Sequence, residues 1–420
     1  MGGYVYGFMI VLLLAALRVA RLKSIFGLAS FEVFFVLISC VYIYAALIDC
    51  VFFGNSKNFR SNYVSFISLM GGFLVFGFYH FSVFLDKVRV NFSLPDSAMY
   101  KKNSALVVFI LGILFLGLYF YDFYQNLISG LLGSDRAYIY KNKGLLTDVL
   151  KLTSVFIIVV TCLVIGNNNE RRFSLRLWLF LFFVACFFVV EVFFYGDRRT
   201  AVSLLVCLFV IRFYKVSVPR TVIFLGTIIG IFFLVFGVLR NRSLLDAYAL
   251  IGSENFWAVF NPVNTEFGAF HIVGSKLYSE GFNSIFMLSF FKAPLSLIPE
   301  SIFPNRPIAP PVWFVKTYFP SIHASGGGVA YNFVMEAFQN FYFMGPFLIG
   351  LFVAFLLRIS KGATSQRPSL LYLFFGFNIL FLMRYDSVTF LRGIVASIMF
   401  YLFFVLVAYT FKAFVSRSSG

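Results

Sequence analysis

The sequence predicts an all-α polytopic membrane protein with about 11 transmembrane helices and one long external loop that contains short helices. Of the 420 residues, 61% are hydrophobic and only 12% are charged. Soluble domains are about half apolar and carry about a quarter charged residues. The apolar residues also form long uninterrupted stretches, and most prolines gather in one segment late in the chain. These three observations together predict the fold class.

The apolar stretches come near the ~20 residues that a helix needs to cross a bilayer. The seventh is short, and Gly345-Pro346 interrupts the ninth. We find no repeat of fixed period and no separate soluble part, so we expect residues 1–420 to form a single transmembrane domain. The predicted spans are 3–17, 26–53, 62–85, 104–123, 146–165, 174–195, 199–214, 219–239, 329–358, 369–384 and 389–411.

Basic residues predict the orientation of these spans. Lys and Arg gather in alternate short connections, as they do on the cytoplasmic side of membrane proteins. The N-terminal tail has no basic residue, and the connection near 54–61 holds only Lys57 and Arg60. We therefore expect the N-terminus and the long loop outside and the C-terminus inside. The net charge of +17 fits this pattern. No basic run stands clear of a span, which argues against a nucleic-acid partner.

The long external loop is predicted at 240–327, between spans 8 and 9. It holds eight of the twelve prolines, two of the three histidines and two of the three tryptophans. Because proline removes a backbone donor, the loop cannot be one continuous spanning helix. It is also rich in Phe, Leu and Ile, so we expect it to fold. We expect the functional site here.

The sequence gives no support for a cofactor or a bound metal. The five cysteines lie in apolar stretches without the spacing of a metal or disulfide framework. We also find no zinc-protease helix motif, no phosphate-binding glycine loop and no calcium-binding loop. We therefore expect no cofactor and no metal ligands.

Arginines at the predicted outer ends of spans are candidates for binding an anion. Gly196-Asp197-Arg198-Arg199 joins two spans at the outer surface, against the orientation rule. These arginines either anchor to lipid headgroups, pair with Glu191 or Asp197, or bind phosphate oxygens in a bidentate manner. Further arginines lie at other outer span ends. Together they predict a positive rim that suits a pyrophosphate, formed by Arg198, Arg199, Arg240, Arg384 and Arg392.

The exit from the long loop supplies candidate proton-transfer residues. On a helix, Asn332, Glu336 and Asn340 recur at four-residue intervals and share one face. Glu336 is expected at or just within the outer interface, where an acidic residue faces a polar cavity or a partner. An ion pair with an outer arginine is the competing interpretation. His323 precedes a triple glycine and is either a surface residue or a second candidate base.

These residues give the chain a resemblance to the Wzy-type O-antigen polymerases, which polymerise oligosaccharide repeat units. The resemblance covers nearly the whole architecture of many spans with one late external loop. It is carried by Gly196-Asp197-Arg198-Arg199, by 297–307 with its Leu-Ile-Pro and Pro-Asn-Arg-Pro runs, by Glu336-Ala337 through Gly345, and by the turn from Arg384 to Arg392.

The resemblance implies a glycosyltransferase of the GT-C type in the bacterial inner membrane, with its active site facing the periplasm. It implies undecaprenyl-pyrophosphate-linked oligosaccharides as donor and acceptor, and a regulator of chain length as a partner. The growing glycan would move to the non-reducing end of a new repeat, releasing undecaprenyl pyrophosphate. The five arginines would hold the pyrophosphate without a metal. Glu336 or His323 would be the base, and substrate would bind at Asn332, Asn340, Trp257 and Trp313.

Two other functions stay open from the sequence. A related O-antigen ligase would transfer finished polymer to lipid A–core, and His323 would then carry more of the chemistry. A transporter of the lipid-linked oligosaccharide is a second alternative. Transporters are typified by internal repeats and by charged residues near the middle of the bilayer, and the sequence shows neither clearly. The concentration of charge at one face therefore favours an enzyme.

Overall fold

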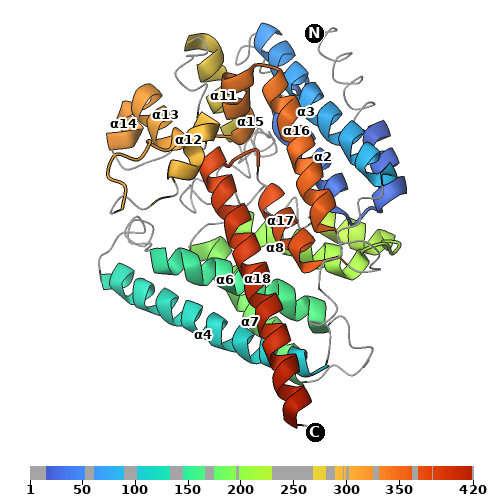
Figure 1. The fold of residues 1–420 in the computed structure, drawn as a ribbon. Helices are drawn as coiled ribbons and strands as arrows, with labels where there is room; N and C mark the ends of the chain where they lie inside the picture. The colour runs from blue at the N-terminus through green and yellow to red at the C-terminus, as the bar shows by residue number, and fades with distance from the viewer. Residues whose placement is uncertain are drawn as a thin grey trace, which may run out of the picture. The chain divides into compact units, whose positions relative to one another are not determined.

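A computed structural model shows that the chain is helical, as the sequence predicts. Every regular element in the part that it describes is a helix, and no strand occurs there (Figure 1). The described residues are 16–52, 61–88, 102–132, 145–165, 175–194, 198–228, 268–280, 289–296, 298, 302–324, 331–361, 368–380 and 382–418.

The long helices overlap the apolar stretches that the sequence marks as spans. They form there because such stretches contain long runs of apolar residues, and the proline in α16, Pro346, lies in its first turn, where a missing backbone donor is tolerated. The predicted ninth span is divided, as Gly345-Pro346 indicates. The helices are α2 (Phe31–Phe52), α3 (Ser61–Lys87), α4 (Lys102–Leu132), α6 (Leu145–Ile165), α7 (Leu175–Val189) with the π-helical turn η2 (Val190–Phe194), α8 (Arg198–Phe213), α16 (Met344–Ser360), α17 (Leu370–Ile379) and α18 (Ser387–Ser418).

Three of the described helices are long and apolar enough to cross a membrane. They contain Phe31–Asp49, Asn62–Lys87 and Ser387–Val407. Five shorter apolar segments accompany them: Ile110–Gln125, Val149–Leu163, Phe182–Val192, Met344–Ser360 and Leu370–Ile379. These helices indicate that the chain is a membrane protein. The count of about 11 spans and the orientation stay predictions.

The described part of the long loop consists of short helices. Proline defines both ends of α13, which starts at Pro310-Pro311, where a missing backbone donor costs nothing, and ends before Phe319-Pro320. The backbone N–H of Phe319 donates to the carbonyl of Val315 at 2.9 Å. Arg240 and Trp257 lie outside the described residues. The short helices of the loop are α11 (Gly268–Glu280), α12 (Ser289–Ser296), α13 (Pro310–Tyr318) and α14 (Pro320–Ala324), and the short helix α15 (Phe333–Phe341) follows the loop.

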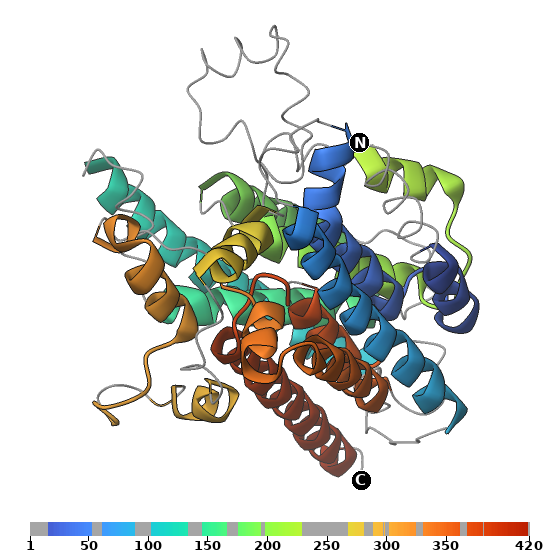
Figure 2. The ribbon, with the colours of Figure 1, turned by 90° about the horizontal axis from the view of Figure 1, so that it is seen from above.

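The chain folds into two compact units, each assembled from segments that are distant in sequence. The first unit combines residues 1–91, 215–359 and 378–394, and the second combines 92–214, 360–377 and 395–420. Helix α18 contributes to both units, and it is the long red helix that runs to the C-terminus (Figures 1 and 2). Most of the predicted site, including α15 and the short loop helices, belongs to the first unit.

Glycines let α3 and α16 approach closely within the first unit. A Cβ atom added to Gly77 would lie 2.6 Å from the carbonyl oxygen of Phe347, and one added to Gly350 would lie 2.7 Å from the backbone nitrogen of Phe78. The two helices run side by side in Figure 1. At their ends, Arg358 lies 4.0 Å from Asp86. Small residues serve this purpose in membrane proteins, where close packing holds helices together.

A buried histidine fixes α11 to α2 and α3. Nε2 of His271 lies 3.0 Å from the carbonyl oxygen of Tyr42, and Nδ1 lies 3.2 Å from the hydroxyl of Tyr63. Burial lowers the pKa of His271 to about 4, so the ring is neutral near pH 7. The backbone nitrogen of Ala46 on α2 also lies 3.2 Å from Nε2, and a neutral imidazole donates from one nitrogen and accepts at the other. Figures 1 and 2 both show α11 beside α3.

Substituting Gly77 tests this packing, and Gly72 on the same helix is a matched control. We expect Gly77→Ala to lower the thermal unfolding temperature, because overpacking costs about 1–3 kcal/mol. A Cβ atom at Gly72 meets nothing within 4 Å. Gly72→Ala should therefore leave the unfolding temperature unchanged or raise it, since alanine favours helix by about 1 kcal/mol. Equal shifts for both variants in the same nanodiscs would contradict the contact.

Candidate functional site

The candidate site is built around α15, the short helix that carries Glu336. Residues 331–340 are all buried. Asn332 caps the helix, because its side-chain oxygen accepts a hydrogen bond from the backbone nitrogen of Met335 at 2.8 Å. The backbone N–H of Phe333 donates to the carbonyl of Tyr385 at 2.6 Å. Tyr342, with φ of 52°, ends the helix. The cap and this backbone bond therefore hold Glu336 against the segment that leads into α18.

The carboxylate of Glu336 is completely buried and receives three hydrogen bonds. The hydroxyl groups of Ser289 and Ser387 both donate to Oε1, each at 2.6 Å. The backbone nitrogen of Ser387 donates to Oε2 at 2.8 Å. A buried carboxylate is costly unless such donors surround it. The site therefore joins the start of α12, the middle of α15 and the start of α18, which are far apart in sequence.

Asn340 completes the network around Glu336. Its amide nitrogen donates to the hydroxyl of Ser289 at 2.8 Å and to the backbone carbonyl of Glu336 at 2.7 Å. Its side-chain oxygen accepts from the backbone nitrogen of Ser289 at 3.2 Å. Asn340 and Glu336 thus bind the same serine, in keeping with their predicted common face. Asn332 differs from Glu336 and Asn340, because its side chain caps α15.

Burial raises the pKa of Glu336 to about 7. The hydrogen bonds from Ser289 and Ser387 oppose this shift, and the nearby carboxylate of Asp386 adds to it. Asp386 caps α18 by accepting hydrogen bonds from the backbone nitrogens of Val388 and Thr389 at 3.2 and 3.3 Å. A carboxyl group that titrates near neutral pH can both take up and release a proton, as a general base requires.

Access to Glu336 is restricted by its own partners. Both carboxylate oxygens accept hydrogen bonds, and the residue has no exposed surface. A substrate hydroxyl therefore reaches the carboxylate only by displacing a serine or by passing its proton through one. The sequence did not single out Ser289 or Ser387, because no local pattern distinguishes them from other serines.

Two buried amide groups near Glu336 have unused hydrogen-bonding capacity. The amide nitrogens of Asn332 and Gln339 have no hydrogen-bond partner among the described residues. The side-chain oxygen of Gln339 accepts from the hydroxyl of Tyr331. Buried polar groups are nearly always hydrogen-bonded in folded proteins. Each of these two donors can therefore bond to a water molecule or to a polar oxygen of a ligand. Gln339 lies three residues from Glu336, and that spacing could have identified it.

The predicted arginines are divided between the two units. Arg384 is half-buried and directly precedes Tyr385, which bonds to α15, while Arg392 is exposed on α18. Arg198 and Arg199 are the first residues of α8, which belongs to the second unit, and Arg199 is half-buried. A single positive rim formed by these residues stays a prediction, and Arg240 lies outside the described residues.

His323 and Trp313 lie on the short helices of the loop. His323 is exposed on α14, which has no buried residue. Trp313 is half-buried on α13, and its ring meets the ring of Tyr318 edge-on at 5.7 Å. Phe314 connects α13 to the site, because its ring lies 5.3 Å from that of Tyr331. His323 is therefore accessible, whereas Glu336 is enclosed.

Removing the cap of α15 should destabilise the helix that carries Glu336. We expect Asn332→Ala to lower the free energy of unfolding by about 1 kcal/mol, the usual cost of losing a side-chain cap. Asn332→Ser is the matched control, because its hydroxyl can still accept from the backbone. Thermal unfolding of the two variants in detergent tests this expectation. A loss of equal size in both would show that the cap is unimportant.

Comparison with known proteins gives no relative for this chain. No family model, no curated protein and no solved structure matches it. Among the described residues, no group of three or more His, Cys, Asp or Glu side chains could hold a metal ion.

Proposed function

We propose that this protein is a membrane glycosyltransferase that polymerises undecaprenyl-pyrophosphate-linked O-antigen oligosaccharide repeat units. The reaction takes place at the periplasmic face of the bacterial inner membrane and needs no metal. The observation that supports a transferase best is the enclosed Glu336, which titrates near neutral pH beside two serines and two buried amide donors. The sequence resemblance supports the choice of substrate.

In the proposed reaction, a hydroxyl at the non-reducing end of the acceptor attacks the anomeric carbon of the donor glycan. A bond forms between that hydroxyl oxygen and the anomeric carbon. The bond from the anomeric carbon to the pyrophosphate oxygen breaks, and undecaprenyl pyrophosphate leaves with the bonding electrons. Glu336 takes the hydroxyl proton. A base with a pKa near the working pH is suited to this step.

Ser387 is the serine better placed to pass the proton to Glu336. Ser289 already accepts a hydrogen bond from Asn340 while it donates to Glu336, so it is fixed within the network. Ser387 donates to the same carboxylate oxygen from the start of α18. The acceptor hydroxyl then donates to the Ser387 oxygen, whose own proton moves to Glu336. The amide nitrogens of Asn332 and Gln339 are available to orient the sugar.

Arginines hold the leaving group in this proposal. A pyrophosphate leaves readily when its negative charge is bound, and guanidinium groups bind phosphate oxygens through paired hydrogen bonds. Arg198 and Arg199 have this role, with Arg240, Arg384 and Arg392 as further members. Trp257 and Trp313 pack against the sugar rings. A regulator of chain length is the expected protein partner.

An O-antigen ligase is the second candidate function. The observation that favours it is the exposure of His323, since a large lipid A–core acceptor could reach this residue more easily than the enclosed Glu336. In a ligase, His323 would take the proton of the acceptor hydroxyl. The two candidates therefore differ in the acceptor and in the residue that acts as base.

Reconstitution of the purified protein in nanodiscs tests the proposed function. The assay supplies the cognate undecaprenyl-pyrophosphate repeat unit together with a metal chelator, and a gel resolves the products. We expect a ladder of lipid-linked oligomers. Glu336→Gln should reduce the rate at least about 100-fold, since general bases contribute on this order, whereas His323→Ala should retain the ladder.

Other outcomes of this assay would contradict the polymerase. Transfer only to added lipid A–core, lost in His323→Ala, would establish the ligase. Movement of the lipid-linked substrate across a vesicle bilayer without any glycosidic product would establish a transporter. Each result requires folded protein, which thermal unfolding of the same preparation verifies.

The polymerisation rate should depend on pH through Glu336. Because the base must be deprotonated, we expect the rate at low substrate concentration to rise as the pH passes about 7. The Ser387 hydroxyl stabilises the carboxylate, so Ser387→Ala should lower the rate and move the midpoint upward by about one pH unit.

Ser397→Ala is the matched control for this pH profile. Ser397 is also a buried serine of α18, but its hydroxyl donates to the carbonyl of Phe374 at 3.3 Å. This variant should keep the wild-type midpoint. A midpoint that stays unchanged in Ser387→Ala would show that Ser387 does not tune the base.

A further inference from the structure

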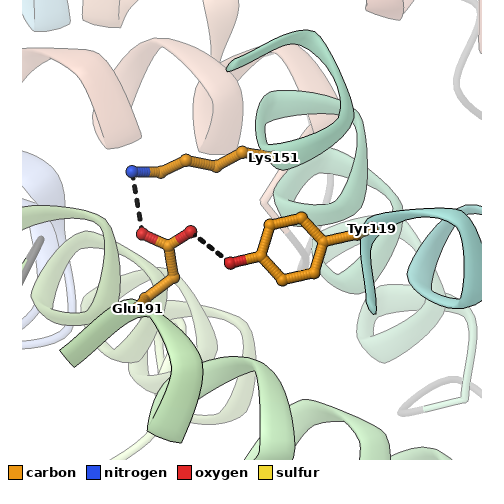
Figure 3. Close-up of polar contacts among 3 residues, drawn as sticks. All are labelled: Tyr119, Lys151 and Glu191. Carbon is orange, nitrogen blue, oxygen red and sulfur yellow. Dashed lines mark hydrogen bonds and ion pairs between the residues drawn. The ribbon is translucent and has the colours of Figure 1, made fainter. Parts of the chain in front are cut away.

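A buried ion pair joins three helices of the second unit. Lys151 on α6 lies 2.8 Å from one carboxylate oxygen of Glu191 in η2, and the hydroxyl of Tyr119 on α4 donates to the other oxygen at 2.6 Å (Figure 3). Glu191 and Tyr119 have no exposed surface, and the Lys151 side chain is 10% exposed. We name these three residues the ion-pair triad.

The triad brings together residues that the predicted topology places at one level of the membrane. Tyr119, Lys151 and Glu191 lie near the ends of the predicted spans 104–123, 146–165 and 174–195. All three ends point to the outer side in the predicted orientation. Charged residues between membrane helices are costly, and they commonly mark functional positions. The triad therefore lies at the level where the lipid pyrophosphate is proposed to bind.

Overall stability is a poor explanation for such an ion pair. Taking two charges out of water costs about as much as their attraction returns, and apolar side chains of similar size often do as well. What a buried pair supplies is direction, because each charge must meet its partner at a defined distance. In the triad, both oxygens of Glu191 are held from two different helices, which fixes the place of this side chain.

Glu191 belongs to a π-helical turn that leads toward the predicted anion clamp. The turn spans Val190–Phe194 at the end of α7, and α8 begins at Arg198, so only residues 195–197 intervene. One additional residue in a helix rotates the following positions by about 100°. The π turn also packs against α8. The π turn therefore lies directly before α8 in the chain and in contact with it, and Arg198 and Arg199 are the first residues of α8.

We infer that the ion-pair triad positions Arg198 and Arg199 for binding a lipid pyrophosphate, by holding the π turn that precedes them. Lys151, Glu191 and Tyr119 are positioning residues and do not touch the substrate. Bidentate binding of phosphate by guanidinium depends on the placement of the planar group, so a shift at the start of α8 weakens binding. This inference rests on the proposed function of the two arginines.

Binding of geranylgeranyl pyrophosphate to the full chain in nanodiscs tests the inference. The central variant combines Lys151→Met with Glu191→Leu, which removes both charges and leaves neither unpaired. We expect it to unfold near the wild-type temperature and to bind about tenfold more weakly. Asp86→Asn is the control, because Asp86 lies near Arg358 in the other unit. Geranylgeraniol has the same isoprenoid tail without the pyrophosphate, so its binding measures the contribution of the tail alone.

A mutant cycle separates positioning from an independent effect. Arg198→Ala with Arg199→Ala should also weaken binding, and adding the apolar replacement to these variants should cause no further loss. If the losses multiply instead, the triad acts independently and the inference is wrong. If the apolar replacement keeps wild-type affinity while the arginine variants lose it, the triad is merely structural and the proposed clamp stands.

Two further results complete the test. If the arginine variants bind like wild type, Arg198 and Arg199 do not bind the pyrophosphate and the triad does not position them. The oligomer-ladder assay then tests the polymerase separately. If the apolar replacement does not fold, Tyr119→Phe takes its place, because it removes one hydrogen bond and keeps the ion pair. That variant should bind about two- to fivefold more weakly, and only when both arginines are present. If Tyr119→Phe weakens binding equally when Arg198 and Arg199 are both replaced by alanine, the inference is wrong.

Discussion

The burial of the Glu336 carboxylate is the constraint around which the first unit is organised. A carboxylate inside a protein needs hydrogen-bond donors, and no donor from its own short helix reaches it. Ser289 and Ser387 supply them from two other segments, and Asn340 fixes Ser289 in place. The start of α12, the middle of α15 and the start of α18 must therefore meet at one point. The same burial of the carboxylate raises the pKa of Glu336 to about 7.

Each unit contains a buried glutamate, and the two glutamates differ in the partners of their carboxylates. This difference matches their proposed roles. Glu336 is surrounded by neutral donors, so its charge is only partly compensated and its proton can exchange near neutral pH. Glu191 faces the ammonium group of Lys151, which compensates its charge directly. The first arrangement suits a group that must gain and lose a proton. The second holds the Glu191 side chain between two helices and keeps its neighbours in place.

Several site residues were predicted from sequence, but their contacts were not. Asn332, Glu336 and Asn340 were expected on one face; the structure makes Asn332 the cap of α15 and joins the other two through Ser289. Glu191 is one candidate partner for the arginines, and the structure shows that its carboxylate receives Lys151 and Tyr119. The common arginine rim and the roles of His323 and Trp313 stay predictions, because no contact described here tests them.

The helical class, the approximate helix positions and a break close to Gly345-Pro346 could all be predicted from the sequence. Those features depend on local properties, namely the length of apolar runs and the effect of proline on the backbone. Tertiary packing alone brings Ser289 and Ser387 to Glu336 and brings Lys151 to Glu191. These residues are separated by long stretches of chain, and serine or lysine carries no local signal of its distant partner. Burial selects such partners, because each enclosed polar group must find a donor or acceptor wherever the fold supplies one.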